Sequence, residues 1–275
     1  MLPDERPFPD AAVPRTVSEH GDATEGGAGS RGNTGMYARS TTFRGDPSAI
    51  DDGIAYTRDK VLPAVRQMDG CIGLSMLVDR HTGRCIVTTS WDDVEAMHRS
   101  AEAIRPIRAM AVRSVHGVES ETEVVEWAVE VLHRVRQAPP TAATRVILAR
   151  GPAGPLDHVT DGFRTIVVPR ADDLPGFCSV SFLVNHELGR CAIAATYEDR
   201  QIMNRAKGQA QAIREQFTDH VGLHVTEVAE FDLVLAQPGP REGLRPAVPT
   251  APSAASTTSG RAARTAWRCP SQPHR

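Results

Sequence analysis

The sequence predicts an α+β fold built from two sister domains, because one long stretch occurs twice and both copies alternate strand and helix patterns in the same order. Residues 39–108 align with residues 145–214 at a constant offset and without a gap. The best match pairs residues 70–85 with residues 176–191, where seven positions are identical. Solenoid repeats have periods of roughly 20 to 50 residues, so a longer repeat is expected to be a whole domain with its own core.

The duplication also sets the expected domain boundaries. We place the first repeat at residues 36–135, a linker at 136–142 and the second repeat at 143–236. The flanking segments, residues 1–35 and 237–275, hold few apolar residues and are predicted to be disordered, since they cannot offset the entropy of the chain. The second flank carries six Arg against one Glu, but the whole chain has a net charge of -3. A solvated tail is therefore favoured, and no nucleic-acid partner is expected.

Composition narrows the class of protein further. No run approaches the roughly 18 apolar residues of a membrane span, and the first residues lack the plan of a signal peptide. We therefore expect no membrane partner and a cytoplasmic location. The five cysteines show no CxxC spacing, which indicates neither a metal site nor a disulfide framework. Cys85 and Cys191 hold equivalent strand positions, where a small buried side chain is favoured over a reactive thiol.

The first repeat is predicted to open with a strand at residues 36–43, followed by a helix. Asp46 can cap this helix and Pro47 suits its first turn. Apolar residues then recur with a period of 3.6 residues until Gly70, and Pro63 predicts a bend near the end of the helix.

A β-hairpin follows at residues 72–79 and 84–91, joined by a short turn in which Gly83 supplies the left-handed residue. The next helix is predicted at residues 92–113, with a kink or an early break at Pro106. A strand at residues 121–131, which alternates between apolar and polar residues, closes the repeat.

The second repeat is predicted to follow the same order. Its elements are a strand at 145–150, a helix at 155–171, strands at 177–185 and 190–197, a helix at 198–217 and a strand at 221–236. Gly162 and the β-branched run at 165–168 favour extended structure, so the first of these helices is predicted from the register of the repeat alone.

The order β-α-β-β-α-β is that of a ferredoxin-like domain, an antiparallel sheet with two helices on one face. On the other face the third strand of each repeat carries small, uncharged residues, which suit close packing on a second sheet. These residues are Ile86, Thr88 and Ser90 in the first copy and Ala192, Ala194 and Thr196 in the second. The chain is therefore predicted to form a barrel-like pseudo-dimer with itself, with an approximate twofold axis between the repeats.

One motif in the first repeat carries a resemblance to a known family. In TTSWDDVEAMHRSAEAIRP, residues 88–106, an aromatic residue closes the third strand, acids open the helix, and His and Ser follow; these are Trp91, Asp92, Asp93, His98 and Ser100. The chain thus resembles the antibiotic biosynthesis monooxygenase family of dimeric α+β barrels, duplicated in tandem. The resemblance covers about 200 residues and both repeats, and rests on this motif and the order of elements.

The resemblance implies a cavity between sheet and helices and a reaction without metal, flavin or other cofactor. Some members oxygenate aromatic substrates, because a deprotonated phenol can itself supply electrons to dioxygen. By this resemblance His98 would act as base or hold the anion, and Trp91 would stack on a small aromatic or quinol-like substrate in the first repeat. The pocket would comprise Thr89, Met97, Ala101, Tyr197 and Asn204.

Other interpretations stay open at this point. Trp91 is also suited to the core, and His98 to a partly exposed structural position. The second copy has Tyr197 and Asn204 in their places, so chemistry that depends on histidine would be confined to the first repeat. A non-enzymatic small-ligand-binding or stress-response barrel is the alternative function. Haem binding is a weaker third, because haem-degrading members have an Asn on the first strand and this chain has none there. A further homodimer also stays open.

Overall fold

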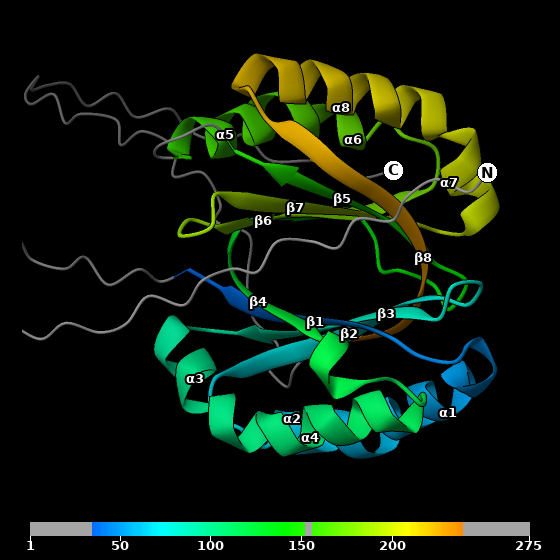
Figure 1. Cartoon of the computed structure of the whole chain (residues 1–275). Helices are drawn as coiled ribbons and strands as arrows, with labels where there is room; N and C mark the ends of the chain where they lie inside the picture. The colour runs from blue at the N-terminus through cyan, green and yellow to red at the C-terminus, as the bar shows by residue number, and fades with distance from the viewer. Residues whose placement is uncertain (1–34, 152–155, 239–275) are drawn as a thin grey trace, which may run out of the picture.

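The computed structural model describes residues 35–151 and 156–238, and these residues form a closed, eight-stranded antiparallel barrel with helices on its outside (Figure 1). The strand order around the barrel is β1-β3-β2-β8-β5-β7-β6-β4. The predicted α+β class and the intramolecular dimeric α+β barrel are confirmed. The two flanking segments predicted to be disordered fall almost entirely outside the described residues.

The predicted order of elements is present in both halves. The first half contains β1 (Tyr37–Arg44), η1 (Pro47–Ala49), α1 (Ile50–Tyr56), η2 (Thr57–Val61), α2 (Leu62–Arg66), β2 (Cys71–Asp79), β3 (Arg84–Trp91), α3 (Val94–Arg99), α4 (Ala101–Ser114), η3 (Glu119–Glu121) and β4 (Glu123–Arg134). The second half contains β5 (Ala143–Arg150), α5 (Asp157–Gly162), η4 (Phe163–Val167), α6 (Val168–Ala171), β6 (Phe177–Asn185), β7 (Arg190–Tyr197), α7 (Arg200–Arg205), α8 (Lys207–Val221) and β8 (His224–Pro238).

The first helical region of each half contains a π-helical segment directly before a proline-containing turn. Pro63 lies in the first turn of α2 and follows η2, and its counterpart Pro169 lies in the first turn of α6 and follows η4. Proline has no N–H for the usual helical hydrogen bond, and the wider π turn accommodates this loss. The β-branched run of the second repeat is helical, as the register predicted and local propensity did not.

The second helical region breaks at a different residue from the one predicted. Pro106 lies inside α4, whereas the break falls at Ser100, between α3 and α4. The second half breaks at the equivalent residue, Ala206. In both halves a buried arginine of the first strand donates to a carbonyl three residues before the break, which takes that carbonyl away from the helix. The prediction of an early break at Pro106 was therefore wrong, whereas the alternative of a kink there stays a prediction.

The barrel is closed by the last strand of each half, which pairs with strands of both halves. Strand β4 pairs with β1 and with β6, and β8 pairs with β5 and with β2. Two ion pairs also join the halves, Arg84 of β3 with Glu227 of β8 and Arg190 of β7 with Glu123 of β4. Each half is thus hydrogen-bonded to the other along two edges.

The inner faces of the two sheets pack on each other through small and aliphatic side chains, as predicted. Ala192 packs with Ala38 and Trp127, and the Nε1 of Trp127 donates to the Oγ of Ser40 at 2.8 Å. Ala194 and Ile86 pack against a second cluster that contains Leu77, Val146 and Phe231. Side chains of the two sheets therefore contact each other between the sheets, and the two cavities described below lie on the helix side.

Each sheet has its own core on the helix side. The first core includes Ile50, Met76 and Trp91, all fully buried. The second is rich in aromatic rings: Phe163 stacks on Phe182 with 4.7 Å between ring centroids, and Phe217 meets Phe163 edge-on at 5.5 Å. No helix within the described residues is long and apolar enough to cross a membrane.

The two hairpin turns provide a matched test of this packing. Gly83 and Gly189 both have φ near +60° to +73°, but a Cβ on Gly83 would lie 2.0 Å from the carbonyl oxygen of Gly45, while one on Gly189 would meet nothing within 4 Å. We expect Gly189→Ala to cost about 1–2 kcal/mol from its left-handed backbone. Gly83→Ala should cost more, because the clash is with backbone. Urea unfolding of both variants measures the difference; equal midpoints would contradict the expectation.

Candidate functional site

A buried arginine on the first strand of each half forms the polar wall of the helix-side space. Arg39 is 3% exposed and donates from Nε and Nη2 to Oε1 of Glu126 at 2.8 and 2.6 Å. Arg145 is 5% exposed and donates in the same way to Oε1 of Glu230 at 3.2 and 2.9 Å. The paired strands place each glutamate directly opposite its arginine. Such pairing is what makes a buried guanidinium tolerable.

The two arginines differ in one hydrogen bond. Arg39 also donates from Nη1 to the Oγ of Ser100 at 2.9 Å. The residue equivalent to Ser100 is Ala206, whose side chain has no acceptor. Within the described chain the Nη1 of Arg145 has no hydrogen-bond partner corresponding to this serine. One donor of Arg145 is thus left for something else.

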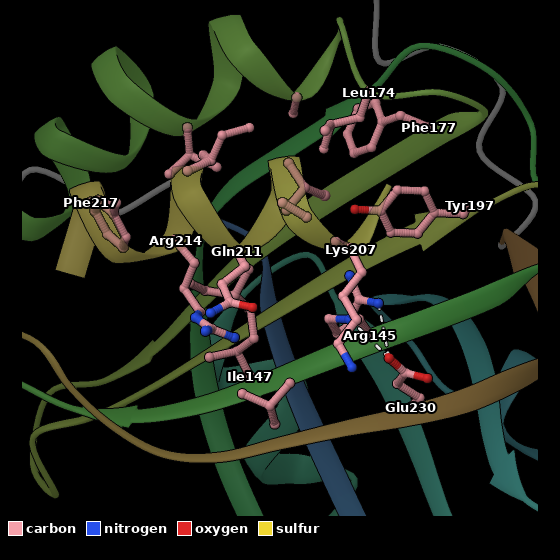
Figure 2. A pocket seen from close by; sticks show the side chains of 18 residues that line it. Arg145, Ile147, Leu174, Phe177, Tyr197, Lys207, Gln211, Arg214, Phe217 and Glu230 are labelled. Carbon is pink, nitrogen blue, oxygen red and sulfur yellow. Dashed lines mark hydrogen bonds and ion pairs between the residues drawn. The ribbon is translucent and has the colours of Figure 1, made fainter. Parts of the chain in front are cut away.

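A cavity of about 550 Å³ opens beside Arg145, between the second sheet and the helices α6 and α8 (Figure 2). Its walls are mainly apolar, and its charged lining residues are Arg145, Lys207, Arg214 and Glu230. The apolar walls are formed by Ile147, Val167, Ala171, Leu174, Phe177, Val180, Ile193, Ala195, Tyr197, Ala210, Ile213, Phe217 and Val228, and Gln211 completes the lining.

The corresponding space in the first half is only about 40 Å³, and it is lined in part by Arg39, Thr89, Ile104 and Arg108. Side-chain size contributes to the difference at three positions. Three alanines of the larger cavity have bulkier counterparts in the first half: Ala171 corresponds to Val65, Ala195 to Thr89 and Ala210 to Ile104. Both Val65 and Ile104 are buried there. The first repeat is filled by its own side chains, and the second is not.

Tyr197 presents its hydroxyl to the larger cavity. The residue is 1% exposed and lines the cavity, and Figure 2 shows its hydroxyl directed into the space among the lining side chains. No hydrogen bond to this hydroxyl is found within the described residues. Burial raises the pKa of Tyr197, while the nearby Arg145 acts in the opposite direction. The phenol therefore stays protonated near neutral pH and acts as a hydrogen-bond donor.

The equivalent aromatic residue of the first half is satisfied internally. The Nε1 of Trp91 donates to the Oγ1 of Thr89 at 3.1 Å. In the second half the residue at the position of Thr89 is Ala195. The change to alanine removes the internal partner and opens space at the same point.

Helix α8 lines one side of the cavity with polar side chains. Lys207, Gln211 and Arg214 follow each other at one-turn spacing along this helix and line the cavity (Figure 2). Lys207 is exposed and has no ion pair within the described part of the chain, and its counterpart in the first half is Ala101. Arg214 is 20% exposed and lies 3.7 Å from Glu215. Exposed Lys207 and Gln211 place the mouth of the cavity at this helix.

Two predicted catalytic residues lie apart from this cavity. Trp91 is fully buried in the first core. His98 is at the surface, with 60% of its side chain exposed, and its Nε2 lies 3.1 Å from Oε2 of Glu126. Neither residue lines the larger or the smaller cavity. A catalytic role for either stays a prediction.

The predicted pocket residues are not brought together. Thr89 lines the smaller cavity and Tyr197 the larger one. Met97 is buried in the first core without lining either cavity, and Ala101 and Asn204 are exposed. Of the predicted set, Tyr197 alone contributes to the larger cavity.

Sequence reasoning missed the cations of the larger cavity, although the repeat contained a signal for two of them. The aligned register begins at Arg39 and Arg145 and ends at Arg108 and Arg214, identical pairs that line the two cavities. Lys207 left no such signal, because its counterpart in the first repeat is the uncharged Ala101. Within residues 35–151 and 156–238, no three His, Cys, Asp or Glu side chains are placed to hold a metal ion.

Comparison with known proteins identifies relatives over both repeats. No family model matches the chain. It is 38% identical over 201 residues to the uncharacterized protein Rv2557 of Mycobacterium tuberculosis H37Rv, which covers 73% of this chain and 88% of that protein. It is also 38% identical over 202 residues to Rv2558 of the same strain, with 73% and 84% covered. The chain belongs to the family of these mycobacterial proteins.

Solved structures show the same fold in more distant proteins. A candidate monooxygenase of Lactobacillus acidophilus NCFM superimposes with a TM-score of 0.53 at 12% identity, covering 73% of this chain and 93% of that one. An anthrone oxidase-like protein gives a TM-score of 0.53 at 11% identity, covering 76% and 95%. At such low identity these likenesses establish the barrel fold alone.

The buried cysteines give a prediction for reactivity. Burial raises the pKa of Cys85 and of Cys191 to about 12, so at pH 8 both groups should be neutral thiols and poor nucleophiles. We expect iodoacetamide to label both slowly in the folded protein and rapidly in urea, as followed by peptide mass spectrometry. Partly exposed Cys71 serves as the internal comparison. Rapid labelling of Cys85 or Cys191 without denaturant would contradict this.

Proposed function

We propose that the protein binds a small, largely apolar molecule in the cavity of its second repeat. The observation that carries the proposal is the contrast between the two halves, about 550 Å³ against about 40 Å³ in the same fold position. Small-molecule sites usually have volumes of about 300–1,000 Å³, mainly apolar walls and a few polar groups. The larger cavity has all three properties, and the smaller one is below this range.

The apolar lining favours a planar body for the ligand. Phe177, Tyr197 and Phe217 place three aromatic rings on the cavity wall. Phe177 and Tyr197 meet edge-on with 6.2 Å between ring centroids. Aromatic rings prefer edge-on or offset contacts with other rings, which supports an aromatic guest between them.

A substitution taken from the first repeat tests this proposal. Ala210→Ile places in the cavity the side chain that fills the first repeat, and we expect it to weaken binding of the neutral fluorophore N-phenyl-1-naphthylamine by at least about tenfold. Ala212→Ile makes the same change two residues later on α8, at an exposed position, and should leave binding unchanged. Fluorescence titration provides the measurement.

Two results would count against the cavity as a binding site. One is an absence of saturable binding to the wild-type protein. The other is equal weakening by Ala210→Ile and Ala212→Ile. Circular dichroism of each variant shows whether the fold is retained.

A second candidate function is cofactor-independent oxygenation of a phenolic or quinol-like substrate. The observation that favours it is the pair of donors on the cavity wall, the protonated Tyr197 hydroxyl and the Arg145 guanidinium. Donors of this kind stabilise an aryl-oxide anion, the electron-rich species that reacts with dioxygen. The likeness to an anthrone oxidase-like protein agrees with this chemistry at the level of fold.

Oxygen uptake with anthrone as substrate distinguishes the two candidate functions and the two repeats. If the cavity of the second repeat is an oxygenase site, Tyr197→Phe should lower the rate by about tenfold or more, as loss of one such donor does elsewhere. His98→Ala should then leave the rate unchanged. The reverse pattern would place the chemistry at His98 in the first repeat, and a wild-type rate equal to that of buffer would exclude anthrone oxygenation.

A further inference from the structure

We infer that the ligand of the second-repeat cavity is an aromatic carboxylic acid, with its carboxylate held by Tyr197 and Arg145. This inference rests on the proposed binding function and names the chemical class of its ligand. Three features carry it: the charge of the lining, the two donors that have no internal acceptor, and the way these features differ from the first repeat.

The charge of the lining favours an anion. Three cations line the cavity, Arg145, Lys207 and Arg214. The one acid in the lining, Glu230, forms an ion pair with Arg145. An excess of cations around an apolar space raises the local concentration of anions and disfavours cationic guests. Lys207 adds a positive charge that the first repeat lacks, since the first repeat has Ala101 at that position.

The strand register brings the two interior donors together. Arg145 lies opposite Ala195, and Tyr197 lies opposite Ala143, so the arginine and the tyrosine are diagonal neighbours on one face of paired strands. Side chains at diagonal positions are about 7–8 Å apart at the backbone and can reach a common partner. A carboxylate between them would accept from the tyrosine hydroxyl and from the arginine Nη1.

The Tyr197 hydroxyl and the Nη1 of Arg145 are donors without an acceptor in the described part of the chain, and both residues line the cavity. A hydrogen bond to a charged acceptor is stronger than one to a neutral acceptor. The first repeat supplies internal acceptors at the corresponding places, Ser100 for the arginine and Thr89 for the aromatic residue. The second repeat has alanine at both places. The acceptor is therefore expected to come from the ligand.

Three ligands that share a naphthalene body test this inference: 1-naphthoate, the neutral 1-naphthylmethanol and the cationic 1-naphthylmethylammonium. We expect 1-naphthoate to bind about tenfold or more tightly than the alcohol, and the ammonium to bind most weakly. Isothermal titration calorimetry at pH 8 and low ionic strength measures all three. The preference for the acid should narrow in 0.5 M NaCl, since screening weakens the attraction at the exposed mouth.

Two variants locate the preference. Tyr197→Phe keeps the ring and removes the hydroxyl, and should reduce the advantage of the acid over the alcohol by several-fold. Lys207→Ala installs the residue of the closed repeat and should also reduce that advantage. Lys60→Ala removes the same charge from an exposed position of the first repeat and should leave it unchanged.

The outcomes separate the inference from the proposed function. Equal affinity for the acid and the alcohol, with both lost in Ala210→Ile, would overturn the carboxylate inference and leave the binding function in place. Equal effects of Lys207→Ala and Lys60→Ala would also overturn it. If none of the three naphthalenes binds and N-phenyl-1-naphthylamine does not bind either, the binding function itself fails.

Discussion

Closure of the barrel by β4 and β8 is the constraint on which the rest of the structure depends. Each of these strands satisfies the backbone donors and acceptors of its own sheet along one edge and those of the other sheet along its second edge. No sheet edge is then left unpaired between the halves, and the inner faces of the two sheets pack on each other. The helix side is where each half has its own core and where the two cavities differ.

On that helix side the buried arginine and its glutamate are the fixed element in both halves. A guanidinium can be held this far from water only when it is paired with a carboxylate. The arginine also donates to the carbonyl of Met97 or Met203, which ends the short helix α3 or α7. The polar wall and the helix break therefore have one cause. What differs between the halves is the set of side chains around this fixed pair.

Much of the fold follows from the sequence, because strand alternation, helix period and turn chemistry are local patterns. Each pattern also occurs in both aligned stretches, so each element is predicted twice. The first helical region of the second half shows why the alignment helps. Gly162 and the run at residues 165–168 favour extended structure, yet the segment is helical, as the aligned first half predicted. The break at Ser100 was missed because it depends on Arg39, which lies 61 residues away in the chain. A local signal such as Pro106 is a poor guide to a boundary set by a tertiary contact.

The location of the site was harder to predict than the fold, for a related reason. A cavity is a space that side chains leave unfilled, and the three alanines that line this one, Ala171, Ala195 and Ala210, lie on three separate elements. Alanine is ordinary in a helix or a strand, so no single position indicates the cavity. The predicted residues instead carried conspicuous chemistry, an imidazole and an indole, and the structure places His98 at the surface and Trp91 in the core.

The filled space of the first half also indicates why the cavity of the second half is suited to an anion. In the first half the guanidinium of Arg108 sits beside Arg39 in a filled space, and burial, together with this like charge, lowers the pKa of Arg108. Crowded cations are tolerated there because Glu126 and Ser100 satisfy Arg39. The second half retains both arginines, adds Lys207 and lacks the serine acceptor. More positive charge with fewer internal acceptors is unfavourable for an empty cavity and favourable for one that receives a carboxylate. A barrel of two halves thus allows one half to be filled while the other keeps a cavity, which suits the proposed charged guest.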